Sequence, residues 1–473
     1  MKENRRDFLR LSILAGVGVG SGLGNRLSAQ SPEDQSAGPE KKISGPQHFN
    51  MSGFAAPKLN TVRAGFIGLG QRGPTHLNNL SKLDSVQIVA LCDLRPEKVS
   101  QAQKHLEGSG RTPAVYSGGA EEWKKLCDRK DIDLVYIATP WDLHTPMAVY
   151  AMEQGKHVAV EVPAAVSLEE CWKLVNTSER TRKHCMMLEN CCYDFFELLT
   201  LNMARQGYFG EIVHAEGSYI HNLLAENFDK KAYWDMWRLK ENTHRNGNLY
   251  PTHGLGPVCQ IMNINRGDKM DYLVSMSGID FNMGKKAKEL AATDDFFKPY
   301  AGMSYRGNMN TSIIRTDMGR TIMIQHDVSS PNVYSRIHKI TGTKGTALKY
   351  PLPGKISNGG ENWLTEPEMK ALEEKYQPAI VKRVGEMAKQ IGGHGGMDFL
   401  LDWRTVDCLR NGLPLDMDVY DAALWSALSP LSEKSVAARS KTIDVPDFTA
   451  GSWKTNKPVD ILLEEGGNTK VNV

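Results

Sequence analysis

The stretch that decides the fold runs from Arg63 to Gly73 and reads R-A-G-F-I-G-L-G-Q-R-G. Residues 62–67 form a short apolar run typical of a buried strand, and residues 76–80 suit a helix. The turn between them is a complete G-x-G-x-x-G. Glycines allow a tight turn and a close backbone approach to a pyrophosphate, and the free N–H groups of the next helix face that anion. The stretch predicts a dinucleotide site whose candidate cofactor-binding residues are Gly68, Gly70, Gln71, Arg72 and Gly73.

A second apolar run, Q-I-V-A-L-C at residues 87–92, supports this interpretation and ends at Asp93. Asp93 lies about twenty residues beyond the glycines, where a carboxylate binds the adenosine ribose hydroxyls. It favours NAD over NADP because it would repel a 2′-phosphate, although the nearby Arg95 weakens that preference.

The chain after Thr61 alternates between strand and helix patterns, which predicts an α/β fold: a doubly wound parallel sheet of the Rossmann type over residues 61–190. Ligands of such sheets bind at the carboxyl ends of the strands. Four candidate cofactor residues fall there: Trp141, His144, Glu161 and Asn190.

The pattern changes after residue 190, and we expect a substrate-binding α+β domain with a mainly antiparallel sheet over residues 191–473. Late helices are expected at Met397 to Arg410 and Val419 to Leu428. The predicted strands are Ile212 to Ile220, Tyr272 to Ser277, Ser312 to Thr316, Thr321 to Asp327 and Arg336 to Thr341.

The N-terminus differs from the rest of the chain. N-R-R-D-F-L-R at residues 4–10 is a twin-arginine pattern, followed by a modest apolar stretch and by small residues near Ala29. Residues 1–30 therefore predict an export signal, and residues 31–60, rich in Ser, Pro, Gly and charge, a linker. We expect an exported protein, periplasmic or secreted, that folds before export.

Bulk composition excludes several classes of protein. The 473 residues are 41% hydrophobic and 24% charged, with a net charge of +2, so no charge argument favours nucleic acid or a membrane surface. No segment reaches the ~18 apolar residues of a spanning helix. The eight cysteines lack a C-x-x-C pair, and we expect buried thiols and no metal site. The sequence leaves the oligomeric state open, and a homo-oligomer is one possibility.

The glycine loop, the segment I-A-T-P-W-D-L-H-T-P-M-A and the segment G-K-H-V-A-V-E-V-P-A together resemble the Gfo/Idh/MocA oxidoreductase family. The resemblance extends the expected cofactor contacts to Asp142, Leu143 and Val162. Val162 stands where that family usually has its catalytic lysine, and an apolar side chain cannot take a proton from an alcohol. The usual family mechanism is therefore not expected here.

Later motifs narrow the match. N-G-N-L-Y-P-T-H-G-L-G-P-V at residues 246–258, L-E-N-C-C-Y at residues 188–193 and H-G-G-M-D at residues 394–398 are similar to glycoside hydrolase family 109. That family contains NAD-dependent α-N-acetylgalactosaminidases. The resemblance implies a glycan or small-molecule substrate with a terminal N-acetylgalactosamine. It implies oxidation of the sugar at C3 by bound NAD, elimination of the aglycone, addition of water and re-reduction, without the usual pair of carboxylates.

The catalytic candidates are His253, expected to accept the 3-hydroxyl proton, and Tyr193, expected to act at C2, with the opposite assignment left open. Aromatic, Arg and His side chains suit sugars, and the candidate substrate-binding residues are Tyr219, Arg238, Tyr250, Pro251, Thr252, His253 and Tyr334. Two other functions remain open at this point: an NAD-dependent sugar dehydrogenase and a non-catalytic NAD-bound sugar-binding protein. The natural glycan and the preferred anomer are also open.

Overall fold

A computed structural model describes residues 47–107 and 112–472, all within the compact unit Ile43–Val473. The predicted export signal, residues 1–30, and the first part of the predicted linker lie outside the described residues.

The first sheet confirms the predicted parallel α/β fold. Its six strands lie in the order β3-β2-β1-β4-β5-β6, and every neighbouring pair is parallel. β1, β4, β5 and β6 are short and buried on both faces, as expected of a sheet covered by helices. The strands are β1 Val62–Ile67, β2 Val86–Asp93, β3 Ala114–Ser117, β4 Leu134–Ile137, β5 His157–Val160 and β6 Cys185–Met187. The helices that alternate with them are α1 Gly73–Ser81, α2 Pro96–Leu106, α3 Glu122–Asp128, α4 Trp141–Glu153 and α5 Leu168–Thr181.

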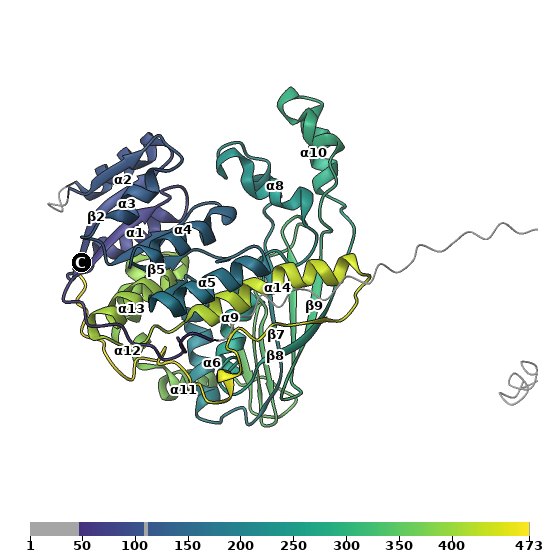
Figure 1. Ribbon diagram of the computed structural model, residues 1–473. Coiled ribbons are helices and arrows are strands. Elements are labelled where there is room, and N and C mark those ends of the chain that lie inside the picture. The colour runs from purple at the N-terminus through teal and green to yellow at the C-terminus, as the bar shows by residue number, and fades with distance from the viewer. Residues whose placement is uncertain (1–46, 108–111, 473) are drawn as a thin grey trace, which may run out of the picture. The chain divides into compact units, whose positions relative to one another are not determined.

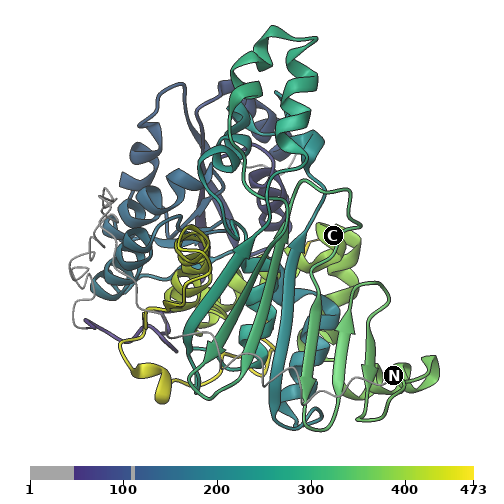
Figure 2. The same ribbon diagram turned by 90° about the vertical axis from the view of Figure 1, so that its right-hand side faces the viewer.

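The second sheet has eight strands in the order β13-β12-β11-β7-β10-β9-β8-β14, and Figure 2 shows its long strands running beside one another. It is mainly antiparallel, as predicted, with one parallel pair, β7 and β10. Alternating buried and accessible positions along β9 show that one face packs against the core. The strands are β7 Ile212–Ile220, β8 Met270–Ser277, β9 Asn310–Thr316, β10 Thr321–Asp327, β11 His338–Gly342, β12 Thr346–Lys349, β13 Lys355–Ser357 and β14 Ile443–Asp444.

Helices from the second half of the chain connect the two sheets. α14 lies along α5 and also contacts β8, and α13 packs against α1 (Figure 1). α9 covers β7, whereas α8 and α10 stand at one end of the second sheet. The remaining helices are α6 Phe195–Arg205, α7 Leu224–Asn227, α8 Trp237–His244, α9 Thr252–Ile261, α10 Met283–Ala291, α11 Glu366–Tyr376, α12 Ala379–Ile391, α13 Met397–Asn411 and α14 Val419–Ala437. Short 3-10 helices are η1 Asn190–Tyr193, η2 Trp234–Met236, η3 Asp295–Gly302, η4 His394–Gly396 and η5 Ser452–Lys454.

The prediction that residues 31–60 are a linker is wrong for their described part. Residues 47–60 pack on the domain: Met51 is buried, the Leu59 N–H donates to the Leu409 carbonyl at 3.1 Å, and Ala55 forms a β-bridge with Pro414. Compact structure thus begins before Thr61, because this segment, although largely polar, packs against α13 and the loop that follows α13. The boundary at residues 190/191 stays a prediction.

Two other expectations concern the whole chain. All eight cysteines are buried and unpaired, which confirms the prediction of buried thiols. Among the described residues, no helix combines the length and the apolar character that a membrane crossing requires.

Candidate functional site

The three glycines of the loop between β1 and α1 have distinct structural roles. A Cβ on Gly68 would lie 2.5 Å from the Ala138 carbonyl oxygen, and one on Gly73 would lie 2.0 Å from the Gly68 oxygen. Gly70 is different: a Cβ there would meet only the end of the Arg95 side chain, at 3.4 Å. Gly68 and Gly73 therefore close the turn, while the backbone at Gly70 is open to a ligand, as a pyrophosphate requires.

Asp93 ends β2 beside this loop. Its carboxylate is buried and accepts hydrogen bonds from the backbone N–H groups of Leu69, at 2.7 Å, and Arg95, at 2.9 Å. Both bonds hold the carboxylate at the edge of the cleft, as the predicted ribose contact requires.

A cleft of about 930 Å³ runs from this loop into the second domain, and most of the predicted residues line it. Asp142, Gly73, Tyr193, Pro251, Thr252 and Tyr334 are not among its lining residues. The predicted residues that line it are Gly68, Gly70, Gln71, Arg72, Asp93, Trp141, Leu143, His144, Glu161, Val162, Asn190, Tyr219, Arg238, Tyr250 and His253.

The four predicted residues at strand ends are fixed by hydrogen bonds or packing. Glu161 accepts from Arg72 Nε at 2.8 Å and lies 2.9 Å from His76 Nε2. Burial alone would raise the pKa of Glu161, but Arg72 and His76 hold it well below its usual range. The two ring nitrogens of His144 lie 2.7 Å and 2.8 Å from backbone carbonyl oxygens. Glu161 is therefore an anion engaged in structural pairs.

His253 stands at the start of α9 and is oriented by a carboxylate. Its Nδ1 lies 2.8 Å from Glu189 Oε1, and Glu189 is fully buried. Burial alone would raise the pKa of Glu189, but His253 lowers it below its ordinary value, so Glu189 is an anion. Because Nδ1 is engaged by this carboxylate, Nε2 is the ring nitrogen available to a ligand, which is the orientation that a general base needs.

Close glycine contacts bring this pair to the cleft. A Cβ on Gly254 would lie 2.5 Å from the Ser218 nitrogen of β7, and one on Gly256 would lie 2.8 Å from Glu189 Cγ. Only glycine permits α9 to approach β7 and η1 so closely. The N-terminus of α9 therefore lies directly beside Tyr219 and Glu189.

Aromatic rings surround Arg238 at the inner end of the cleft. The guanidinium carbon lies 5.0 Å from the ring centre of Tyr250, 5.3 Å from that of Trp141 and 5.9 Å from that of Tyr219. Arg238 Nη1 donates to Tyr233, but Nη2 is buried without a hydrogen-bond partner among the described residues. An unpaired buried donor among aromatic faces suits a sugar hydroxyl or amide oxygen.

Several predicted residues have other roles. Pro251 and Thr252 are buried at the start of α9, where they position His253, and their contact with a substrate stays a prediction. Asp142 is exposed on α4 and is not among the residues that line the cleft, and Gly73 is a packing residue. Tyr334 is 36% exposed and lies beside His221, with ring centres 4.8 Å apart, which places it next to the cleft wall.

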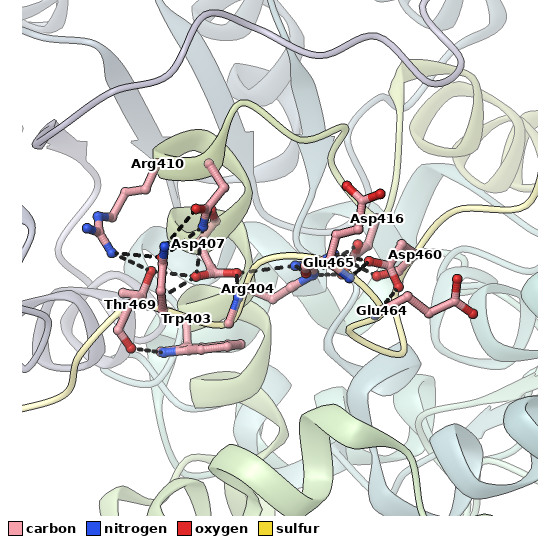
Figure 3. Close-up of polar contacts among 12 residues, drawn as sticks. Trp403, Arg404, Asp407, Arg410, Asp416, Asp460, Glu464, Glu465 and Thr469 are labelled. Atoms are coloured by element: carbon pink, nitrogen blue, oxygen red, sulfur yellow. Dashed lines mark hydrogen bonds and ion pairs between the residues drawn. The ribbon is translucent and has the colours of Figure 1, made fainter.

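The structure contradicts the catalytic role predicted for Tyr193. The side chain is fully buried, and its hydroxyl donates to Asp416 Oδ2 at 2.9 Å. Asp416 belongs to a buried network in which Arg404 also pairs with Asp407 and Asp460 (Figure 3). Burial and Asp416 raise the pKa of Tyr193 well above its usual value. The short helix η1 turns this ring away from the cleft, a direction that strand and helix patterns do not encode.

Other residues that line the cleft are not among the site residues predicted from the sequence. His221 carries a signal that was available, because it lies two positions after Tyr219 and directly follows β7, which ends at the cleft. His394, in a glycine-rich turn, is another. The outer part of the cleft beyond Asp93 is lined by side chains of α2, α3 and α4 that no motif marks, such as Lys98, Trp123 and Tyr150.

Glu189, Cys191 and His253 place three potential metal-ligand atoms within 4.8 Å of one another. Their atoms have other partners: Glu189 holds His253, and Cys191 Sγ lies 3.0 Å from Arg336 Nη1. Burial raises the pKa of the Cys191 thiol well above its usual value, which disfavours the thiolate that a metal needs. These residues are better explained as the group that orients His253 than as a metal site.

Comparison with known proteins fits this geometry. Residues 62–189 match the model of the oxidoreductase family with an NAD-binding Rossmann fold, and residues 193–455 match the C-terminal domain of glycosyl hydrolase 109. A glycosyl hydrolase family 109 protein from Shewanella pealeana is 45% identical over 98% of this chain and 100% of its own length. A Bacteroides fragilis protein named alpha-N-acetylgalactosaminidase is 48% identical over 86% of this chain and 97% of its own.

Solved structures support the fold alone. A levoglucosan dehydrogenase in complex with NADH and levoglucosan has a TM-score of 0.62 at 17% identity, covering 82% of this chain and 100% of its own. The matches to both family models and to full-length relatives identify the chain. It belongs to glycosyl hydrolase family 109 and is a glycoside hydrolase with an NAD-binding Rossmann domain.

Proposed function

We propose that this enzyme is an α-N-acetylgalactosaminidase that uses NAD as a recycled cofactor. The observation that carries the proposal is the carboxylate-held His253 in the same cleft as the open Gly70 backbone. The relative named alpha-N-acetylgalactosaminidase, at 48% identity, supports the choice of sugar.

The residues around the cleft fit NAD. Gly70 and the start of α1 suit the pyrophosphate, Asp93 suits the adenosine ribose, and Trp141, His144 and Val162 line the next part of the groove. Bound NAD would oxidise the sugar at C3 and reduce it again at the end of the cycle, so that none is consumed. The preference for NAD over NADP rests on Asp93, beside which Arg95 also lies.

His253 is proposed to accept the proton of the sugar 3-hydroxyl through Nε2. Glu189 fixes the ring and stabilises the imidazolium that forms, because its carboxylate lies on the opposite nitrogen. The His253–Glu189 pair would supply the base that is missing because Val162 stands where the related oxidoreductases usually have a catalytic lysine.

Tyr219 and His221 are proposed to remove the proton at C2, the role first assigned to Tyr193. The Tyr219 hydroxyl lies 3.0 Å from His221 Nδ1. Burial and Arg238 lower the pKa of His221, so its ring is neutral and Nδ1 accepts the hydroxyl proton. Burial raises the pKa of Tyr219 and Arg238 opposes that rise. Tyr219 would take the C2 proton as it passes its own to His221.

A hydrolase that uses two carboxylates has less support. The acidic residues that line the cleft among the described residues are Asp93, Glu121, Glu153 and Glu161. Asp93 and Glu161 are held in other pairs, and Glu121 and Glu153 belong to the outer part near α3 and α4. None of them forms a free pair beside Arg238.

One assay separates the candidate functions. Purified enzyme, with no added NAD, should release 4-nitrophenol from 4-nitrophenyl α-N-acetylgalactosaminide over many turnovers, and denaturation should release bound nucleotide. Substrate deuterated at C2 should lose its label to water. A dehydrogenase would form NADH in proportion to product, and a binding protein would do neither. Retention of the C2 deuterium during turnover would contradict the elimination route.

Export by the twin-arginine route is also proposed, from Arg5 and Arg6 in the sequence. Eight buried, unpaired cysteines are compatible with folding in a reducing compartment before export. Replacing both arginines by lysine should leave folded, active precursor in the cytoplasm. Normal delivery of that variant, measured by cell fractionation, would contradict the proposal.

A further inference from the structure

An exposed tryptophan stands at the mouth of the cleft. Trp234 lies on η2, lines the cleft and is 44% exposed. Among the described residues, none makes a hydrogen bond, a ring contact or a cation–π contact with its indole. Tryptophan is largely buried in most folded proteins, and it is enriched where an aromatic face meets a ligand or a partner. The indole of Trp234 therefore offers an uncovered face to a ligand in the cleft.

The turn that carries Trp234 has a costly backbone conformation. Asp235 and Met236, which follow it directly, are non-glycine residues in the left-handed region, with φ of 53° and 46°. Such residues are uncommon, and strain of this kind persists only where surrounding contacts impose it. Here the Asp235 carboxylate pairs with Lys240 Nζ at 2.5 Å, and the Met236 side chain is buried. These contacts fix η2 and, with it, the position of Trp234.

The neighbours of Trp234 place it at the end of the cleft that holds the sugar candidates. Tyr233, the residue before it, accepts a hydrogen bond from Arg238 Nη1 at 3.1 Å. The ring of Trp237 on α8 lies 5.0 Å from that of Trp141 at the start of α4, and α8 stands across from α4 in Figure 1. η2 is thus tied to the inner end of the cleft by Arg238, while Trp234 itself reaches solvent.

We propose that Trp234 is a platform for the aglycone, which is the sugar residue that carries the terminal N-acetylgalactosamine. This inference rests on the proposed function. When the terminal sugar lies at Arg238, the group on its C1 extends toward the mouth of the cleft, where the indole of Trp234 is uncovered. One face of a sugar ring is made of C–H groups, and stacking buries that face while the hydroxyls at its edge still meet water.

The competing occupant of the indole face is the cofactor. The hydrogen bond from Arg238 to Tyr233 favours the aglycone, because it ties η2 to the sugar end, whereas Gly70 and Asp93 of the cofactor groove lie on the first domain. A ring that covered the cofactor would help to retain the nucleotide. A platform for the aglycone would not, so nucleotide retention separates the two.

The test compares two substrates that share the terminal sugar. Methyl α-N-acetylgalactosaminide has no ring in its aglycone, whereas the disaccharide N-acetylgalactosaminyl-α-1,3-galactose does. In Trp234→Ala we expect kcat/KM for the disaccharide to fall about tenfold or more, and kcat/KM for the methyl glycoside to stay within about twofold of wild type. Trp234→Phe keeps an aromatic face and should retain most of the activity on the disaccharide. The released N-acetylgalactosamine is measured by chromatography.

Trp363→Ala is the matched control. Trp363 is 41% exposed, close to the exposure of Trp234, but it does not line the cleft. Its replacement should leave kcat/KM for both substrates unchanged. Melting temperature and bound nucleotide, measured on each variant, show whether the fold and the cofactor groove are intact.

Equal losses on the two substrates, or no loss on either, would overturn the role of Trp234 while leaving the proposed function in place. So would a wild-type enzyme that prefers the methyl glycoside to the disaccharide. Loss of bound nucleotide from Trp234→Ala would assign the ring to the cofactor instead. A wild-type enzyme that turns over neither substrate would overturn the proposed function.

Discussion

Individual residues in this cleft differ in whether their polar atoms are already paired. Glu161, predicted as a ligand contact, is neutralised by Arg72 and His76, whereas Glu189, which the sequence-based site list omits, meets His253. Both are buried glutamates near strand ends. Their partners, and not their positions in the sequence, separate a structural anion from one that supports a base.

Replacing Glu189 by glutamine tests that distinction. Glu189→Gln keeps the size of the side chain but removes the charge that stabilises an imidazolium at His253, so kcat should fall by about 10²–10⁴. Turnover of the 4-nitrophenyl glycoside and melting temperature are the measurements. Glu169→Gln, at an exposed glutamate paired with Lys173, is the control and should change neither. A kcat within threefold of wild type would show that His253 acts without its carboxylate.

The correction at Tyr193 leads to the opposite expectation. Tyr193→Phe removes the hydroxyl that donates to the buried Asp416, so the free energy of unfolding should fall by about 1–3 kcal/mol. kcat should stay within about threefold because the ring lies outside the cleft. Urea unfolding and turnover measure both effects. A large loss of kcat with unchanged stability would restore the catalytic role first predicted.

At the scale of elements, the sequence was most informative where backbone chemistry is restrictive. The glycine loop was predictable because G-x-G-x-x-G has few structural solutions, and the strands β7 and β10 were predictable because both contain β-branched residues of strand type. α10, β12 and β13 were missed, since they are short or polar and depend on tertiary contacts. The direction of Tyr193 was unpredictable because one turn of 3-10 helix sets it.

The contact between α9 and β7 gives a prediction about an element. In Gly254→Ala the new Cβ would lie 2.5 Å from the Ser218 backbone nitrogen, so α9 must move and take His253 with it. We expect kcat to fall at least tenfold and the melting temperature to drop.

Gly302→Ala is the matched control for this change. Gly302 has open space around it and an ordinary φ, so alanine should be tolerated there without loss of kcat or stability. Wild-type kcat in Gly254→Ala would show that the close approach of α9 to β7 is not needed to place His253.

For the described part of the molecule as a whole, α13 joins the glycine loop to the C-terminal half through buried charges. His76 on α1 lies 2.9 Å from Asp402 on α13 and 2.9 Å from Glu161 after β5. Tyr136 on β4 donates to the same Asp402, and Arg72 bonds Asp398 one turn earlier on α13. The protonated ring of His76 therefore lies between the carboxylates of Asp402 and Glu161 and connects the N-terminal and C-terminal halves of the chain.

This connection makes stability depend on pH. Burial alone would lower the pKa of His76, but Asp402 and Glu161 raise it to about 10, and Arg72 opposes them only in part. An unfolded histidine titrates near 6.5, so between these values the native state binds more protons than the unfolded state. Stability from this group is therefore complete below about pH 6.5 and is lost as pH rises toward 10.

His76→Gln isolates the effect, since glutamine can donate to one carboxylate but does not titrate. The variant should melt below wild type at pH 6.5, and the difference should shrink steadily as pH approaches 10, because wild type loses the proton that the variant never had. His244→Gln, at an exposed histidine, should follow the wild-type curve at every pH. The measurement is the melting temperature of wild type and His76→Gln across this pH range. A difference between the two that stays constant or grows with pH would mean that His76 is neutral in the folded protein. The two carboxylates would then depend on their other donors, which are Arg72 and the Val162 N–H at Glu161 and Asn79 and Tyr136 at Asp402.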